Sequence, residues 1–120
     1  MKKRILIIDD DARNIFALAA TLRAKGYETE SSNSAPEAIE LLNTDAQFHT
    51  ILMDMMMPEM DGYEAIPIIK KIPSRNKTRV IAVTAQAMVG DREKCLAAGA
   101  DGYLSKPVDV DKLLEILQHV

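Results

Sequence analysis

Short apolar runs alternate with longer amphipathic stretches along the whole chain. The first run, residues 5–8, is apolar at every position, as expected for a strand that is buried on both faces of a parallel sheet. The stretch that follows, residues 13–26, carries Ile15, Leu18 and Leu22 at helical spacing and ends in a glycine. This pattern predicts a strand followed by an amphipathic helix with a glycine stop.

The same alternation recurs five times. The predicted strands are residues 5–8, 27–31, 50–53, 80–83 and 102–105, and the predicted helices are residues 13–26, 34–43, 61–71, 90–99 and 109–120. Because parallel strands are joined by right-handed crossovers, the alternation favours an α/β fold in which helices cover both faces of one parallel sheet. Pro67 lies inside the third predicted helix, so we expect that helix to be kinked or shortened at Ile66.

The composition narrows the class of protein. A length of 120 residues suits one domain, so we expect residues 1–120 to form a single unit without an output domain. One cysteine, Cys95, cannot form a disulfide within the chain. The net charge of −3, with no basic stripe, argues against direct nucleic-acid binding. No apolar stretch is long enough for a signal peptide or a membrane span, so we expect a cytoplasmic protein without membrane contact.

Four of the five predicted strands end at chemically distinctive side chains. Asp9 and Asp10 follow the first strand, Asp54 follows the third, Thr84 follows the fourth and Lys106 follows the fifth. The carboxyl ends of parallel strands line the crevice where ligands bind in open α/β sheets. We therefore expect three carboxylates, a hydroxyl and an ammonium group to meet at one edge of the sheet.

This set of side chains suits a metal and a phosphoryl group. Asp9, Asp10 and Asp54 would repel one another and raise at least one pKa unless a cation lies between them. Oxygen ligands without histidine or cysteine favour a hard cation such as Mg²⁺. Lys106 and Thr84 are suited to holding phosphoryl oxygens, and an aspartate can attack phosphorus to form an acyl phosphate.

The chain resembles, over its whole length, the CheY-like receiver domain of two-component response regulators. Four motifs in order carry the resemblance: ILIIDDD, ILMDMMMPEMDG, VIAVTA and YLSKP. The stretch from VIAVTA to the last helix is most similar to receivers of hybrid histidine kinases and phosphorelays. The resemblance implies a flavodoxin-like (βα)5 three-layer sandwich with a five-stranded parallel sheet in the order 2-1-3-4-5.

The resemblance also implies roles for the acidic residues. Asp54 would be the phosphoacceptor and a ligand of Mg²⁺. Asp10 would bind the metal directly, and Asp9 would act mainly through water. The backbone carbonyl of Met56 would complete the protein ligands.

The remaining site residues have implied roles as well. Thr84 and Lys106 would hold phosphoryl oxygens, and the peptide bond between Lys106 and Pro107 would be cis. Tyr103 matches the aromatic residue that turns inward when Thr84 moves toward the phosphoryl group. These residues would make the chain a phosphorylation-dependent switch.

The implied partners are proteins. A histidine kinase or a histidine-phosphotransfer protein would donate the phosphoryl group from a phosphohistidine. A downstream target would bind the face formed by residues 90–99, 102–105 and 109–120, and a phosphorylation-dependent homodimer is a further implied outcome. The domain would catalyse only its own phosphotransfer and autodephosphorylation.

Some of the same residues also have simpler possible roles. Asp11 is suited to cap the first helix, and Thr84 and Tyr103 are also common as structural residues of strands. An aspartate-nucleophile phosphohydrolase is one rival, but such enzymes usually carry a second acid at the position of Met56. A phosphorylation-independent interaction module is the other rival, and its signature would be loss of the acidic residues or of Lys106.

The resemblance further implies that Met56 and Gln86 occupy the two positions beside the acceptor that tune the lifetime of the aspartyl phosphate. Methionine at Met56 cannot orient an attacking water, whereas Gln86 has an amide that can. We therefore expect a phosphoryl group that is not among the fastest to be lost.

Overall fold

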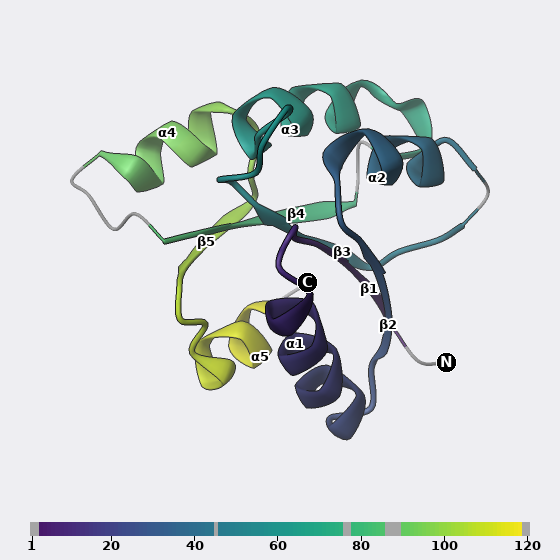
Figure 1. Cartoon of the computed structure of the whole chain (residues 1–120), viewed down its shortest axis with the longest axis vertical. Coiled ribbons are helices and arrows are strands. Elements are labelled where there is room, and N and C mark those ends of the chain that lie inside the picture. The colour runs from purple at the N-terminus through teal and green to yellow at the C-terminus, as the bar shows by residue number, and fades with distance from the viewer. Residues whose placement is uncertain (1–2, 45, 76–77, 86–89, 119–120) are drawn as a thin grey trace.

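A computed structural model describes residues 3–44, 46–75, 78–85 and 90–118. Its strands are β1 (Arg4–Ile8), β2 (Glu28–Ser32), β3 (Thr50–Asp54), β4 (Arg79–Thr84) and β5 (Gly102–Ser105). All neighbouring strands are parallel, in the order β2-β1-β3-β4-β5 (Figure 1). The predicted sheet and strand order are therefore confirmed.

The helices form two outer layers. They are α1 (Ala12–Ala24), α2 (Ala35–Leu42), α3 (Gly62–Lys71), α4 (Asp91–Ala97) and α5 (Val110–Gln118), with a 3₁₀ turn η1 (Pro73–Arg75) before β4. Figure 1 shows α2, α3 and α4 on one face of the sheet and α1 and α5 on the other. In the described parts of the chain, no helix is long and apolar enough to span a membrane.

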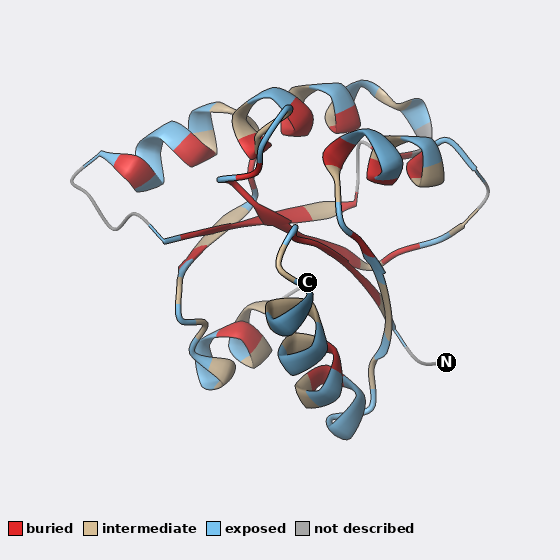
Figure 2. Cartoon of the chain, in the orientation of Figure 1, coloured by how far each residue is buried: buried red, intermediate tan, exposed pale blue. Residues whose placement is uncertain are grey.

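The central strands are buried on both faces, which explains why residues 5–8, 51–53 and 80–83 are apolar at every position (Figure 2). In β1, Leu6 and Ile8 face the core beneath α2, α3 and α4, whereas Ile5 and Ile7 face the core beneath α1 and α5. Complete burial of each such side chain contributes roughly 1.5–3 kcal/mol. The sheet is thus a rigid platform for the residues at its carboxyl edge.

Side-chain caps begin three of the helices, including the cap that the sequence predicts at Asp11. The carboxylate of Asp11 accepts a hydrogen bond from the backbone N–H of Arg13 at the start of α1. Ser34 and Asp61 each accept a hydrogen bond from the backbone N–H three residues later, at the starts of α2 and α3. Such caps satisfy backbone donors that have no partner within the helix.

The third helix is not shortened at Ile66, which was one of the two expected effects of Pro67. Helix α3 continues through Pro67 to Lys71. Pro67 is the sixth residue of α3, so its missing N–H removes only one hydrogen bond, to the carbonyl of Tyr63. Ile66 and Ile69 on either side are fully buried, and this burial offsets the loss.

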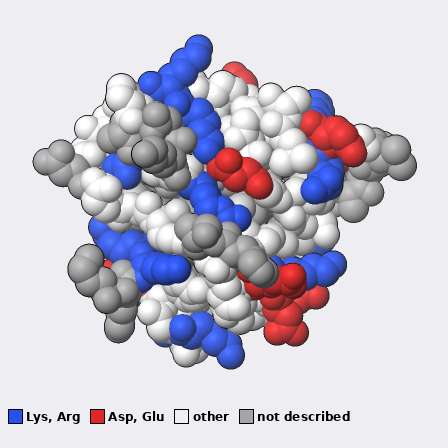
Figure 3. Space-filling view, turned by 180° about the vertical axis from the view of Figure 1, so that it is seen from behind, with Lys and Arg blue, Asp and Glu red and all other residues white. Residues whose placement is uncertain are grey.

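Charged side chains of both signs are interspersed on the face of the molecule shown in Figure 3. The same view shows large uncharged areas between them. This surface matches the small net charge of −3.

Candidate functional site at the carboxyl edge of the sheet

The ends of four strands bring the predicted site residues to one edge. Asp54 is the last residue of β3, and Thr84 is the last residue of β4 and is fully buried. Asp9 directly follows β1, and its backbone N–H donates to the carbonyl of Ser32 at the end of β2. Lys106 directly follows β5, and its backbone N–H donates to the carbonyl of Thr84 over 2.7 Å. Backbone hydrogen bonds therefore fix where these side chains begin.

Three carboxylates gather there as predicted. Asp9, Asp10 and Asp54 each offer an oxygen, and these oxygens lie within 4.8 Å of one another. Asp9 and Asp54 are buried, at 3% and 4% exposure, whereas Asp10 is exposed. Oxygen atoms at this spacing are suitable ligands for a hard divalent cation.

Lys106 lies between the two buried carboxylates. Its Nζ is 3.3 Å from Oδ2 of Asp9 and 3.3 Å from Oδ2 of Asp54. Burial lowers the pKa of Lys106, but the attraction of Asp54 and Asp9 outweighs this effect, so the pKa is raised overall. Lys106 is therefore a permanent cation in this crevice at neutral pH.

The electrostatic environment of Asp54 is unfavourable for its charge. Burial raises the pKa of Asp54, and the negative charge of Asp9 raises it further. The backbone N–H of Met56, which donates to Oδ1 over 3.1 Å, and the ammonium of Lys106 lower it, but the net shift is upward. An additional cation would relieve this repulsion.

Two hydrogen bonds hold the side chain of Asp9 in place, and one of them comes from Asn14, for which the sequence predicts no role. Oδ1 of Asp9 accepts a hydrogen bond from the backbone N–H of Asp11 over 2.8 Å. Oδ2 accepts one from the side-chain amide of Asn14 over 3.5 Å, in addition to the contact with Lys106. The sequence offers one indication of this contact, because Asn14 is a polar residue about one helical turn after the run of aspartates.

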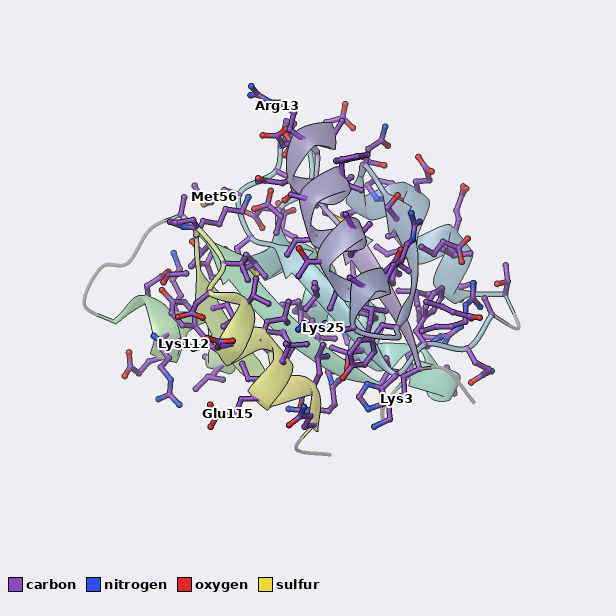
Figure 4. The ribbon with its side chains drawn as sticks, turned by 90° about the horizontal axis from the view of Figure 1, so that it is seen from below. Lys3, Arg13, Lys25, Met56, Lys112 and Glu115 are labelled. Carbon is purple, nitrogen blue, oxygen red and sulfur yellow. The ribbon has the colours of Figure 1, made fainter. Side chains whose placement is uncertain are left out.

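The loop after β3 folds back closely over its own beginning. The backbone N–H of Gly62 donates to the carbonyl of Met55. A Cβ on Gly62 would lie 2.9 Å from Cα of Met55 and would also collide with its Sδ. Met55 is fully buried, whereas Met56 is 49% exposed and points outward at the edge that also carries Arg13 (Figure 4).

The proposed switch residues lie on neighbouring strands. Tyr103 of β5 is half-buried, and its hydroxyl donates to Oδ2 of Asp91 over 3.1 Å. Thr84 pairs with Ser105 in the register of β4 and β5. The peptide bond between Lys106 and Pro107 is cis, and Gln86 lies outside the described residues.

Comparison with known proteins identifies the class. The sequence model of the family described as "Response regulator receiver domain" matches residues 5–118. This chain therefore belongs to the response regulator receiver family, the receiver domains of two-component and phosphorelay signalling. It is a signalling domain rather than a member of an enzyme family.

Particular relatives lie within this class. The chain is 38% identical over 113 residues to the signal transduction histidine-protein kinase BarA of Escherichia coli K12, covering 94% of this chain but only 12% of the kinase. It is 35% identical over 118 residues to the polar-differentiation response regulator DivK of Brucella ovis, covering 98% of this chain and 95% of DivK.

A solved structure of similar sequence contains a metal. The receiver domain of the sensor histidine kinase PA1611 from Pseudomonas aeruginosa PAO1 is 35% identical to this chain, with a TM-score of 0.89. The match covers 98% of this chain and 96% of that receiver, which has a magnesium ion coordinated in its active-site cleft.

Proposed function

We propose that this receiver domain accepts a phosphoryl group from a phosphohistidine onto Asp54 and thereby acts as a signalling switch. The observation that carries the proposal is a buried aspartate with a raised pKa, 3.3 Å from Lys106, within a cluster of three carboxylates. In the reaction, an oxygen of Asp54 bonds to phosphorus while the N–P bond of the donor breaks. The electron pair of that bond stays on the imidazole nitrogen, and no oxidant or reductant is needed.

Mg²⁺ is the metal that fits these residues. Asp10 and Asp54 would bind it through carboxylate oxygens, Asp9 would bind it mainly through water, and the carbonyl of Met56 would complete the protein ligands. The support is the spacing of the three carboxylates together with the raised pKa of Asp54. When bound, the ion would offset the negative charge of the carboxylates and of the phosphoryl oxygens.

Lys106 and Thr84 would hold the transferred group. Lys106 is a fixed cation beside Asp54, so it would stabilise negative charge on a phosphoryl oxygen. Thr84 ends the strand next to β3, and its hydroxyl can donate to another such oxygen. The backbone of both residues is hydrogen-bonded at the carboxyl edge of the sheet.

A protein donor is the proposed source of the phosphoryl group. A hollow of about 230 Å³ beside Asp9 and Lys106 opens between α1 and the segment that begins α5. Phe16 on the same helix is 77% exposed and would add apolar contact area to a docked partner. A histidine kinase or a histidine-phosphotransfer protein would dock here, in keeping with the kinase BarA being a relative.

The output would be a change on the face formed by α4, β5 and α5. Tyr103 lies on this face, beside a hollow that Lys112 and Glu115 of α5 also line (Figure 4). A downstream protein, or a second copy of the chain, would bind there after phosphorylation. The mixed surface charge and the net charge of −3 favour protein over nucleic acid as the partner. We place the switch, residues 1–120, in the cytoplasm, in keeping with a single, fully buried cysteine.

The test is intact-mass spectrometry after incubation with acetyl phosphate. We expect one phosphoryl adduct in the presence of Mg²⁺, and none after chelation or in Asp54→Asn. Asp101→Asn is a matched control, because Asp101 also pairs with a lysine but lies outside the carboxylate cluster. If acetyl phosphate and a phosphorylated histidine-phosphotransfer protein both fail to form the adduct, the proposed function is wrong.

A further inference from the structure

A second buried carboxylate lies away from the phosphoacceptor crevice. Asp91 is the first residue of α4 and is 8% exposed. Oδ1 of Asp91 accepts a hydrogen bond from the hydroxyl of Tyr63 over 2.8 Å, and Oδ2 accepts one from the hydroxyl of Tyr103 over 3.1 Å. The two tyrosines belong to α3 and β5, so one side chain links three elements.

Both hydrogen bonds are charge-assisted, because a hydroxyl donates to a carboxylate in each. Burial raises the pKa of Tyr63 and of Tyr103, and the bond to Asp91 raises each further. Both hydroxyls are therefore protonated donors at neutral pH. Hydrogen bonds from a neutral donor to a buried carboxylate are roughly twice as strong as those between neutral groups. Withdrawing either hydroxyl leaves a buried charge with one donor fewer.

Two contacts coexist in the structure, one at Asp54 and one at Asp91. Lys106 forms an ion pair with the carboxylate of Asp54. A phosphoryl group on Asp54 would take the place of the carboxylate oxygen in this contact. In the same arrangement, Tyr103 donates to Asp91. A movement of Tyr103 away from this position must break that hydrogen bond.

We infer that Asp91 is a positioning residue of the switch, which holds Tyr103 in the resting arrangement and opposes its movement on phosphorylation. This inference rests on the proposed function. The role of Asp91 differs from that of a purely structural cap, because it acts through the hydroxyl of Tyr103. Tyr63 provides the contrast, because it contacts the same carboxylate from α3 without being part of the switch.

The consequence can be measured as an affinity for a phosphoryl mimic. A domain whose binding-competent arrangement is only fractionally populated binds with an affinity reduced by that fraction. Removing a hydrogen bond that favours the resting arrangement should therefore tighten binding. For one hydrogen bond to a buried charge, the expected gain is about tenfold.

The experiment is a titration with beryllofluoride in saturating Mg²⁺, followed by the backbone amide signals of the loop after Asp54. Asp91→Asn and Tyr103→Phe should each tighten binding about tenfold, and the double variant should bind no more tightly than either single variant. Tyr63→Phe leaves the Tyr103 bond in place, so it should change the affinity less than twofold. Tyr103→Phe also covers the case in which Asp91→Asn fails to fold.

Several results would overturn the inference. An unchanged affinity in both Asp91→Asn and Tyr103→Phe would exclude a restraint on the switch. An effect of Asp91→Asn that persists in the Tyr103→Phe background would show that Asp91 does not act through that hydroxyl. If Asp54 accepts a phosphoryl group but these variants fail to tighten binding, only this inference fails. If the wild-type domain neither binds beryllofluoride nor accepts a phosphoryl group, the proposed function fails as well.

Discussion

Asp54 and Asp91 are both buried carboxylates, yet their surroundings differ in kind. Asp54, at 4% exposure, faces another carboxylate, Asp9, and shares a single ammonium group with it. Asp91, at 8% exposure, receives one tyrosine hydroxyl on each oxygen and faces no second acid in its hydrogen-bonded cluster of described residues. The protein satisfies the second carboxylate with its own donors and leaves the first one partly uncompensated.

This difference suits Asp54 to a chemical role and Asp91 to a positioning role. A buried charge that its own fold repels is stabilised when a cation binds, so its site is suited to binding a metal and to reaction. A buried charge with matched donors stabilises the arrangement that provides them. The same residue type therefore has opposite effects on stability at the two positions, and substitutions can test this directly.

The largest expected effect is on the rate of phosphorylation. Lys106→Met removes the cation that compensates Asp54 and would stabilise the phosphoryl oxygens, so we expect the initial rate with acetyl phosphate to fall about 10²-fold. Lys112→Met, on the exposed face of α5, is the control and should leave the rate unchanged. Equal rates in the two variants would show that Lys106 has no part in the reaction.

At the satisfied carboxylate, the loss of charge should destabilise the fold. Asp91→Asn replaces an oxygen that accepts a tyrosine hydroxyl with an amide, so we expect the free energy of unfolding to fall by about 1–3 kcal/mol. Urea denaturation measures this value. Unchanged stability would mean that the two tyrosine bonds contribute nothing to the folded state.

At the uncompensated carboxylate, the same substitution should stabilise the fold. Without Mg²⁺ at neutral pH, we expect Asp54→Asn to raise the free energy of unfolding by about 1–2 kcal/mol, because it removes a repelled, buried charge. The pKa of Asp54 is raised above its ordinary value of 3.8 only in the folded state. Its destabilising contribution is therefore fully present above the folded pKa and disappears as the pH falls below the unfolded value.

The gap between wild type and Asp54→Asn should thus close on acidification, and it should also close when Mg²⁺ is added at neutral pH. Denaturation curves at several pH values, with and without the metal, measure both trends. A wild-type domain that is more stable than Asp54→Asn in metal-free solution at neutral pH would contradict the account of Asp54 as a repelled charge.

The smallest expected effect concerns the lifetime of the aspartyl phosphate. Met56 is 49% exposed beside Asp54 and cannot orient a water molecule. We expect Met56→Asn to accelerate hydrolysis by a few fold, as an amide can position the attacking water. The loss of the phosphoryl adduct with time measures this rate. An unaltered rate would rule out an influence of this position.

The sequence predicts the carboxyl-edge site well because the fold itself gathers it. Asp9 and Asp54 lie at the ends of the neighbouring strands β1 and β3, and Lys106 follows β5 at the same edge and reaches both carboxylates with its long side chain. The contact between Asp91 and Tyr63 has no such rule, because it depends on how two helices pack on the same face of the sheet.

Two further features, the contact of Asn14 with Asp9 and the full length of α3, could not be predicted from the sequence for similar reasons. Asn14 reaches Asp9 only because α1 begins directly beside the crevice. The continuation of α3 through Pro67 reflects burial of its neighbours, which outweighs one lost hydrogen bond. In both cases tertiary packing decides what local pattern leaves open.

Chemical trapping of the acyl phosphate locates the phosphorylated residue directly. Borohydride reduces an acyl phosphate of aspartate to homoserine, and peptide mapping then reads its position after treatment with acetyl phosphate and Mg²⁺. We expect homoserine at position 54 alone. Homoserine at Asp9 or Asp10, or no homoserine in a domain that carries a phosphoryl adduct, would contradict this expectation.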